Sequence, residues 1–213
     1  MGKNISSKKL GGVYPAEHII RFIARNYYSK ERSQIKILDF GCGVGAHTWY
    51  LSREGFDTYA FDISQTAIEK LQSRFEREML KAHILSADGM NMPYENEFFD
   101  AIIDNVSIQS NRISDIKVMY SSVYSKLKTG GKFITVVFGK ETTGYGTGKE
   151  IEAGTYEGIT KGCLQGVGCR HFFEKSELKE ILEMIGFKNI ELEFITYSDR
   201  GNIVNQLMAV GEK

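Results

Sequence analysis

Three glycines near residue 40 have a spacing that suits binding of a nucleotide-like cofactor. Gly41, Gly43 and Gly45 follow an apolar run that ends at Phe40, and a helical pattern begins directly after them. Glycine-rich turns between a strand and a helix commonly bind nucleotides. Glycine tolerates the tight turn, and the missing Cβ leaves room for a ligand. We therefore expect this loop to form the core of a cofactor site.

The charge of the residue before the loop separates two kinds of cofactor. The run from Gly41 to Ala46 formally satisfies the dinucleotide fingerprint G-x-G-x-x-[GA]. Asp39, however, places a carboxylate at the end of the strand, where it would repel a pyrophosphate and attract the ammonium and sulfonium groups of S-adenosylmethionine. We therefore favour this cofactor, with S-adenosylhomocysteine as its product. An NAD-dependent oxidoreductase is the alternative.

Two further carboxylates follow the next two predicted strands. Asp62 ends the second strand, and its two oxygens can accept hydrogen bonds from both hydroxyls of a ribose. Asp88 follows the third strand and can accept from the exocyclic amine of adenine, with Ile63 and Met90 as apolar walls for the ring. Three acidic strand ends lie where open α/β sheets bind ligands. The alternative for Asp39 and Asp62 is to cap a loop or a helix, and the alternative for Asp88 is an ordinary Asp-Gly turn.

The elements that must position these residues alternate along the chain. Short apolar runs alternate with helical patterns, which indicates a doubly wound α/β fold with a parallel sheet. The predicted strands are 35–40, 58–61, 82–86, 99–104 and 132–138, and the predicted helices between them are 46–53, 65–80 and 113–127. A helix over residues 15–28 precedes the sheet. A helix over 175–185 leads into an antiparallel hairpin of strands 188–197 and 203–210.

One region interrupts this alternation. Residues 139–169 contain many glycines and little periodicity, so we expect no regular secondary structure there. Long loops in compact domains are usually functional. With its continuation to residue 172, the segment is predicted to be a lid-like excursion over the acceptor site, and Tyr145 and Tyr156 suit a mobile lid.

Taken together, the motifs resemble those of the class I S-adenosylmethionine-dependent methyltransferases, and by subtype the small-molecule branch. The resemblance covers nearly everything from residue 35 to the C-terminus. The segments that carry it are 37–45, Asp62, 87–88, 98–103, 127–132 and 171–173. It implies a Rossmann-like three-layer sandwich, whose seven-stranded, mostly parallel sheet has the order 3-2-1-4-5-7-6 with an antiparallel seventh strand. The length of 213 residues fits a single domain over 1–213.

The resemblance also implies that the end of the fourth predicted strand lies beside the transferred methyl group. Cys42, inside the loop, is interpreted as a small space-filling residue rather than a nucleophile. The full set of candidate cofactor-binding residues is Asp39, Gly41, Cys42, Gly43, Gly45, Thr48, Asp62, Ile63, Asp88, Gly89, Met90, Asp104 and Asn105.

Methyl transfer from a sulfonium is an in-line displacement, so a base is needed only when the acceptor must lose a proton. The candidate bases are His171 and His18, and Tyr14 can close over the sulfonium by cation–π attraction. The fourth strand end lacks the motifs of nucleic-acid amine and cytosine-C5 enzymes, and the magnesium-binding triplet of catechol-type enzymes is not matched. We therefore predict no catalytic metal. Cys163, Cys169 and His171 could be metal ligands, but a fourth is missing.

The amino-acid composition limits which binding partners and which cellular compartment we expect for the protein. Lys plus Arg and Asp plus Glu each number 27, so no global charge would draw the protein onto nucleic acid or an anionic membrane. The three cysteines form no disulfide framework, and no apolar run approaches the roughly 20 residues of a membrane span. We expect a cytoplasmic enzyme with a small-molecule acceptor. A methyltransferase-like binding module and a protein or RNA methyltransferase are the alternatives.

Overall fold

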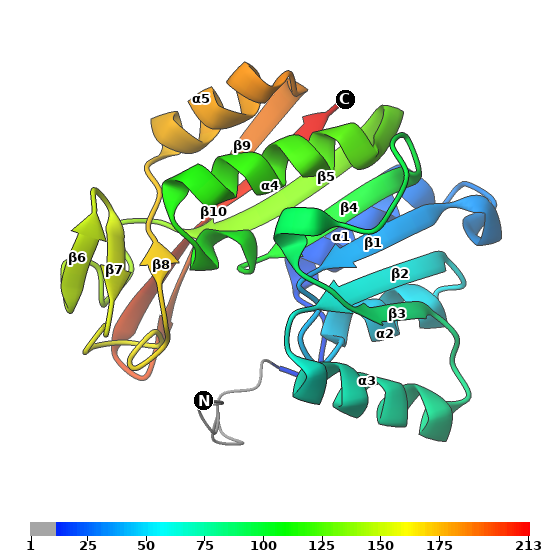
Figure 1. The fold of residues 1–213 in the computed structure, drawn as a ribbon, viewed down its shortest axis with the longest axis horizontal. Coiled ribbons are helices and arrows are strands. Elements are labelled where there is room, and N and C mark those ends of the chain that lie inside the picture. The colour runs from blue at the N-terminus through cyan, green and yellow to red at the C-terminus, as the bar shows by residue number, and fades with distance from the viewer. Residues whose placement is uncertain (1–11) are drawn as a thin grey trace. The chain divides into compact units, whose positions relative to one another are not determined.

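The structure is a computed structural model that describes residues 12–213. The chain forms two compact units, an N-terminal unit that ends at Asn91 and a C-terminal unit, Met92–Lys213 (Figure 1). The single domain expected over residues 1–213 stays a prediction.

Within residues 12–91, the N-terminal unit contains three parallel strands and three α-helices. Its elements are α1 (Glu17–Tyr27), η2 (Arg32–Gln34), β1 (Lys36–Phe40), α2 (Ala46–Arg53), β2 (Asp57–Asp62), α3 (Gln65–Glu78), β3 (His83–Ser86) and η3 (Gly89–Asn91). In register, Lys36 of β1 pairs with Asp57 of β2, and Tyr59 of β2 pairs with His83 of β3. The helices and strands predicted for this part of the chain are present, with ends that differ by one or two residues.

Apolar spacing explains the helices of this unit. In α1, the residues at helical spacing, Ile19, Phe22, Ile23 and Tyr27, are buried. Such a stripe faces the core of a globular protein, and each large apolar side chain contributes about 1.5–3 kcal/mol when fully buried. In α3, Ser64 caps the first turn by accepting from the backbone N–H of Ala67.

The C-terminal unit completes the large sheet and carries a small one. Its elements are β4 (Phe99–Asn105), η4 (Ile108–Ser110), α4 (Ile113–Lys126), β5 (Leu127–Phe138), β6 (Lys149–Glu152), β7 (Thr155–Glu157), β8 (Arg170–His171), α5 (Lys175–Ile185), β9 (Lys188–Asp199) and β10 (Asn202–Glu212). β4 and β5 are parallel, whereas β10 is antiparallel to both β5 and β9. α4 packs on β5, and α5 packs on β9 and β10 (Figure 1).

The order of the large sheet is β3-β2-β1-β4-β5-β10-β9. β9 and β10 are the sixth and seventh strands of this sheet in chain order, so the predicted order 3-2-1-4-5-7-6 is confirmed. The mixed α/β, Rossmann-like class and the antiparallel C-terminal hairpin are confirmed with it. Residues 129–131, between the predicted helix 113–127 and the predicted strand 132–138, lie inside β5, as an irregularity between the pairs Phe99–Leu127 and Ala101–Lys132.

The prediction that residues 139–169 lack regular secondary structure is wrong. Strands β6, β7 and β8 form a three-stranded antiparallel sheet (Figure 1). Its strands have only two to four residues, too few for a readable alternation of apolar and polar side chains. Gly148 illustrates the tight turns, because a Cβ on it would collide with the carbonyl oxygen of Glu157.

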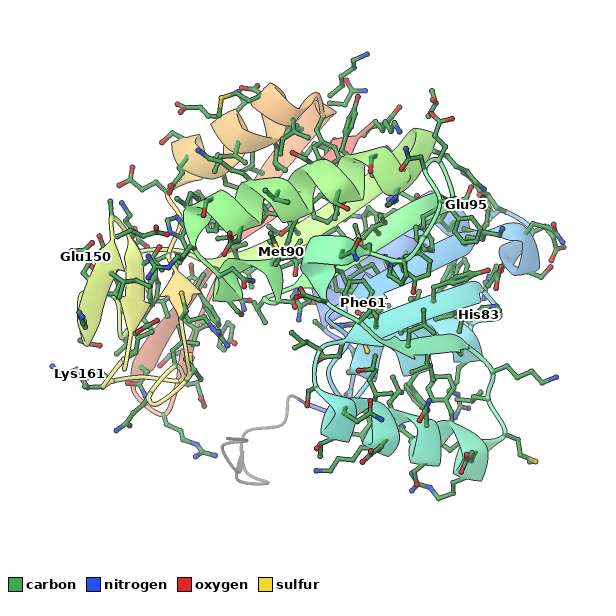
Figure 2. The ribbon with its side chains drawn as sticks, in the orientation of Figure 1. Phe61, His83, Met90, Glu95, Glu150 and Lys161 are labelled. Carbon is green, nitrogen blue, oxygen red and sulfur yellow. The ribbon has the colours of Figure 1, made fainter. Side chains whose placement is uncertain are left out.

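This excursion has its own apolar core. Phe138, Tyr156, Ile159, Leu164, Phe172 and Val204 form a buried cluster. Figure 2 labels Glu150 on β6 and Lys161 in the segment after β7. The glycine-rich composition therefore reflects close turns around a packed centre. Whether the excursion acts as a lid stays a prediction.

Within residues 12–213, no helix is both long enough and apolar enough to cross a membrane.

Candidate functional site

The glycine loop of the N-terminal unit has the backbone that its sequence predicts. Gly41, Gly43 and Gly45 all have positive φ, at 63°, 54° and 80°, a region in which other residues are strained. A Cβ on Gly43 would meet no atom within 4 Å, whereas one on Gly45 would collide with the side chain of Leu71. Gly45 therefore allows α3 to pack closely, and Gly43 leaves open space beside the loop.

Asp62 ties the loop to the end of β2. Its Oδ2 accepts from the backbone N–H of Gly43 at 2.8 Å, and its Oδ1 accepts from the backbone N–H of Ser64 at 2.8 Å. Each carboxylate oxygen can accept more than one hydrogen bond. Asp62 is thus fixed in orientation, and its oxygens retain the capacity to accept further hydrogen bonds; its contact with a ribose stays a prediction.

Asp39 is buried, with 1% of its surface exposed. Its Oδ2 accepts from the backbone N–H of Thr48 at 2.9 Å and from the Thr48 hydroxyl at 2.6 Å. Gly45, the N-cap of α2, has no side chain that can cap the first turn. The carboxylate of Asp39 performs that function from β1, and Thr48 holds it.

This burial changes the electrostatic argument made from the sequence. Burial raises the pKa of Asp39 to about 7, because a low-dielectric environment disfavours the charged form. Asp39 is therefore not the solvent-exposed anion at the strand end that the charge argument assumed. Any attraction to a cationic cofactor would act from beneath the loop.

His47 is a residue of this region that the sequence reasoning missed. Its Nδ1 lies 3.8 Å from Oδ1 of Asp39, and its Nε2 accepts from the backbone N–H of Ala16 at 3.3 Å. Burial lowers the pKa of His47 to about 4. It is neutral at pH 7 and lies between the start of α1 and the buried carboxylate. The sequence places His47 in the first turn of the predicted helix 46–53, next to Thr48, and this position could have identified it as a residue of the site.

Cys42 fills space within the loop, as interpreted from the sequence. It is buried in an apolar cluster with Ala60, Leu71 and Phe75. Burial raises the pKa of its thiol above the ordinary value, so the nucleophilic thiolate is disfavoured.

The candidate adenine-binding residues lie on or next to the ends of β2 and β3. Asp88 accepts from the backbone N–H of Met90 at 2.9 Å and so orders the turn into η3. A Cβ on Gly89 would collide with the ring of Phe40, which explains the glycine. Ile63 and Met90 are large apolar side chains that are 73% and 39% exposed, and Figure 2 labels Met90. Exposed apolar side chains at these strand ends suit the predicted walls of a ring site.

In the C-terminal unit, Asp104 has a structural role at the end of β4. It is fully buried and accepts from the backbone N–H groups of Ser107 and Ile108, both at 3.0 Å, and from the Thr135 hydroxyl at 2.6 Å. Asn105 is the last residue of β4 and is partly exposed. Val106 follows with a φ of 59°, which is strained for a β-branched residue.

His171, a candidate base, has both ring nitrogens engaged. It is 1% exposed, with Nδ1 at 2.7 Å from the Thr155 hydroxyl and Nε2 at 3.1 Å from Oε1 of Glu177. Burial raises the pKa of Glu177, but the hydrogen bond to His171 and the contacts with the backbone of Glu174 and with Lys140 together outweigh it and leave that pKa below its usual value. His171 thus joins β8 to β7 and to the start of α5, an arrangement that suits a structural role better than proton transfer.

The other two candidate catalytic residues belong to the N-terminal unit. Tyr14 is 77% exposed, and His18 is partly buried on α1. The alternative metal set is not assembled in the described structure. Cys163 is exposed, His171 is occupied, and no group of three potential ligands is found within residues 12–213.

Part of the chain is similar to a known domain family. Residues 37–131 match the family model described as a methyltransferase domain. The 18S rRNA (guanine-N(7))-methyltransferase of Bos taurus is 32% identical over 111 residues, which is 48% of this chain and 38% of that protein. Phosphoethanolamine N-methyltransferase 2 of Caenorhabditis elegans is 27% identical over 164 residues, which is 75% of this chain and 34% of that protein. The chain thus spans less than two fifths of these relatives.

The fold has close counterparts among solved structures. A SAM-dependent methyltransferase from Methanosarcina mazei superposes with a TM-score of 0.72 at 17% identity, over 93% of this chain and 98% of that chain. At this identity the likeness concerns the fold.

Proposed function

Because residues 37–131 carry a methyltransferase domain and the whole fold is that of S-adenosylmethionine-dependent methyltransferases, we propose that this chain is such an enzyme. The observation that carries the proposal is the bond between the loop and β2. Asp62 accepts from the N–H of Gly43, so a carboxylate suited to a ribose and an open glycine turn are held side by side. An adenosyl group needs both features.

The residues of the loop fit this cofactor. The open space at Gly43 lets a ligand approach the backbone, and exposed Ile63 and Met90 offer apolar surface to a ring. When bound, S-adenosylmethionine supplies an activated methyl group. The chain's own contribution is binding and orientation, since an in-line displacement needs a correctly placed acceptor in a water-poor site.

For the acceptor, we propose a small molecule. The supporting observation is the equal number of basic and acidic residues, because proteins that bind nucleic acid usually carry a basic surface. The Caenorhabditis relative is named for phosphoethanolamine. The Bos taurus relative is named for 18S rRNA, which keeps an RNA acceptor as the second candidate. The cytoplasmic location stays a prediction.

Calorimetry tests the cofactor. The protein should bind S-adenosylmethionine and S-adenosylhomocysteine and should not bind NAD. Binding of NAD without the sulfonium cofactor would overturn the proposal in favour of the oxidoreductase.

A screen with methyl-labelled cofactor tests the reaction and the acceptor class. Small metabolites and RNA are offered separately, and label is expected in the metabolite arm. Label only in RNA would replace the small-molecule acceptor. Cofactor binding without label in any arm would favour the binding module.

A further inference from the structure

Arg170 of β8 is a partly buried cation with an unusual environment. Its Nη1 donates to the backbone carbonyl of Cys169 at 2.7 Å. Its Nε is buried and has no hydrogen-bond acceptor among residues 12–213. Burial lowers the pKa of Arg170, although a guanidinium remains charged in proteins.

Six other arginines of the chain have carboxylate partners, whereas Arg25 and Arg53, like Arg170, have none within the described residues. Arg32 lies 2.7 Å from Glu54, and Arg74 lies 3.1 Å from Glu78. Within the described residues, Arg170 has no carboxylate within 4.0 Å. Residues 1–11 contain no Asp or Glu, so they hold no side-chain carboxylate that could pair with it. Arg170 keeps part of its surface exposed, so water solvates part of the guanidinium. Its Nε, however, is buried without an acceptor, and an unsatisfied buried donor is costly. A ligand oxygen that accepts from Nε would remove this cost.

A second buried donor without a partner lies on the neighbouring element. Gln109 of η4 is fully buried and accepts from the backbone N–H of Phe138 through Oε1. Its Nε2 has no acceptor in the part of the chain that the structure describes. β8 packs against η4, so the two unsatisfied donors lie on adjacent elements of the C-terminal unit.

His171, the other residue of β8, shows on which face of the strand the side chain of Arg170 lies. The side chain of His171 is bound between Thr155 and Glu177. Successive side chains of a strand point to opposite faces, so the side chain of Arg170 leaves β8 on the face away from these partners. It is therefore not drawn into the hydrogen-bond network that joins β8 to α5.

We propose that Arg170, assisted by Gln109, binds an anionic oxygen group of the methyl acceptor, a carboxylate or a phosphate. A guanidinium matches the geometry of both groups and can bind them through two parallel hydrogen bonds. An amide N–H adds a third donor. That the anion belongs to a methyl acceptor rests on the proposed function. The anion site itself rests only on the two unsatisfied donors.

Thermal unfolding with inorganic phosphate and with succinate tests the site, at an ionic strength held constant with sodium chloride. A ligand that binds only the folded state raises the unfolding temperature. We expect at least one of the two anions to raise it for the wild type. A response to succinate alone assigns a carboxylate, and a response to phosphate alone assigns a phosphate.

Variants show whether Arg170 is responsible. Arg170→Gln should weaken the responding anion at least tenfold, and Arg200→Gln should leave the response intact, because Arg200 is 92% exposed. Gln109→Glu keeps the acceptor for Phe138 and replaces the unsatisfied donor by a carboxylate. It should abolish the response without loss of the fold, and this variant decides the question if Arg170→Gln does not fold.

The proposal is overturned if neither anion raises the unfolding temperature of the wild type, or if the response survives in both Arg170→Gln and Gln109→Glu. Calorimetry of S-adenosylmethionine on the same preparations is the independent readout. Its affinity should be unchanged in all variants. Loss of anion binding with normal cofactor binding leaves the proposed function standing, and the reverse result rejects the function without rejecting the anion site.

Discussion

The glycine loop of the N-terminal unit and the excursion of the C-terminal unit contain the same abundant residue for different reasons. In the loop, the carboxylate of Asp62 accepts from the backbone N–H of Gly43. In the excursion, glycines form turns around a core that includes Phe138 and Phe172. Glycine content alone therefore does not distinguish a binding loop from a packed segment, and it does not distinguish an ordered segment from a flexible one. The partners of the backbone make the distinction.

The largest expected effect is on the pH dependence of stability, and it comes from Asp39 and His47, the two buried titratable residues beneath the glycine loop. The pKa of Asp39 is raised to about 7 and that of His47 is lowered to about 4. Through Asp39, the free energy of unfolding of the protein falls by about 4 kcal/mol as the pH rises from about 4 to about 7. Through His47, it falls by about 3 kcal/mol as the pH falls from about 6.5 to about 4. In the wild type these two slopes oppose each other.

Single variants should separate the slopes. Asp39→Asn should leave stability that rises with pH between 4 and 6.5, and His47→Gln should leave stability that falls between 4 and 7. Urea unfolding at several pH values measures both. Flat profiles in both variants would show that the two groups do not titrate as buried residues.

The next effect tests close packing at the loop. Gly45→Ala should lower the free energy of unfolding by about 3 kcal/mol, because it adds backbone strain and a collision with Leu71. Gly43→Ala is the matched control. It has a positive φ and open space, so its cost should be about 1 kcal/mol. Equal costs in urea unfolding would contradict the structural difference between the two glycines.

A smaller effect is expected in the excursion. His171→Leu removes two hydrogen bonds at a buried position and should cost about 2 kcal/mol of stability. Cofactor affinity should not change. Loss of methyl transfer in a variant of undiminished stability would instead assign His171 to proton transfer, as first expected from the sequence.

The smallest effect concerns the ribose carboxylate. Asp62→Asn keeps the size of the side chain and should weaken S-adenosylmethionine binding by about 1–2 kcal/mol, because charge-assisted hydrogen bonds are lost. Calorimetry measures the change. Asp57→Asn, on the same strand but at its opposite end, is the control and should bind normally.

The sequence predicted what depends on local pattern. The glycine loop and the α/β class follow from residues close together in the chain and from the alternation of elements, whereas the strand order follows from the resemblance to class I methyltransferases. The burial of Asp39 did not follow, because it depends on α2 folding back over β1 so that Thr48 reaches the carboxylate. His171 was identified as a functional candidate, but its contact with Glu177 at the start of α5 could not be read from spacing. The strands β6 to β8 were missed because they are too short to show a period.

Two structural demands conflict at Val106, the first residue after β4. A backbone at φ 59° favours glycine there, yet the side chain packs on the core of the excursion. Substitution by glycine would relieve the strain and remove that packing, and substitution by another residue would keep the strain. We expect homologues that retain this excursion to vary little at this site, so engineers who reshape the excursion for a new acceptor should leave residue 106 alone.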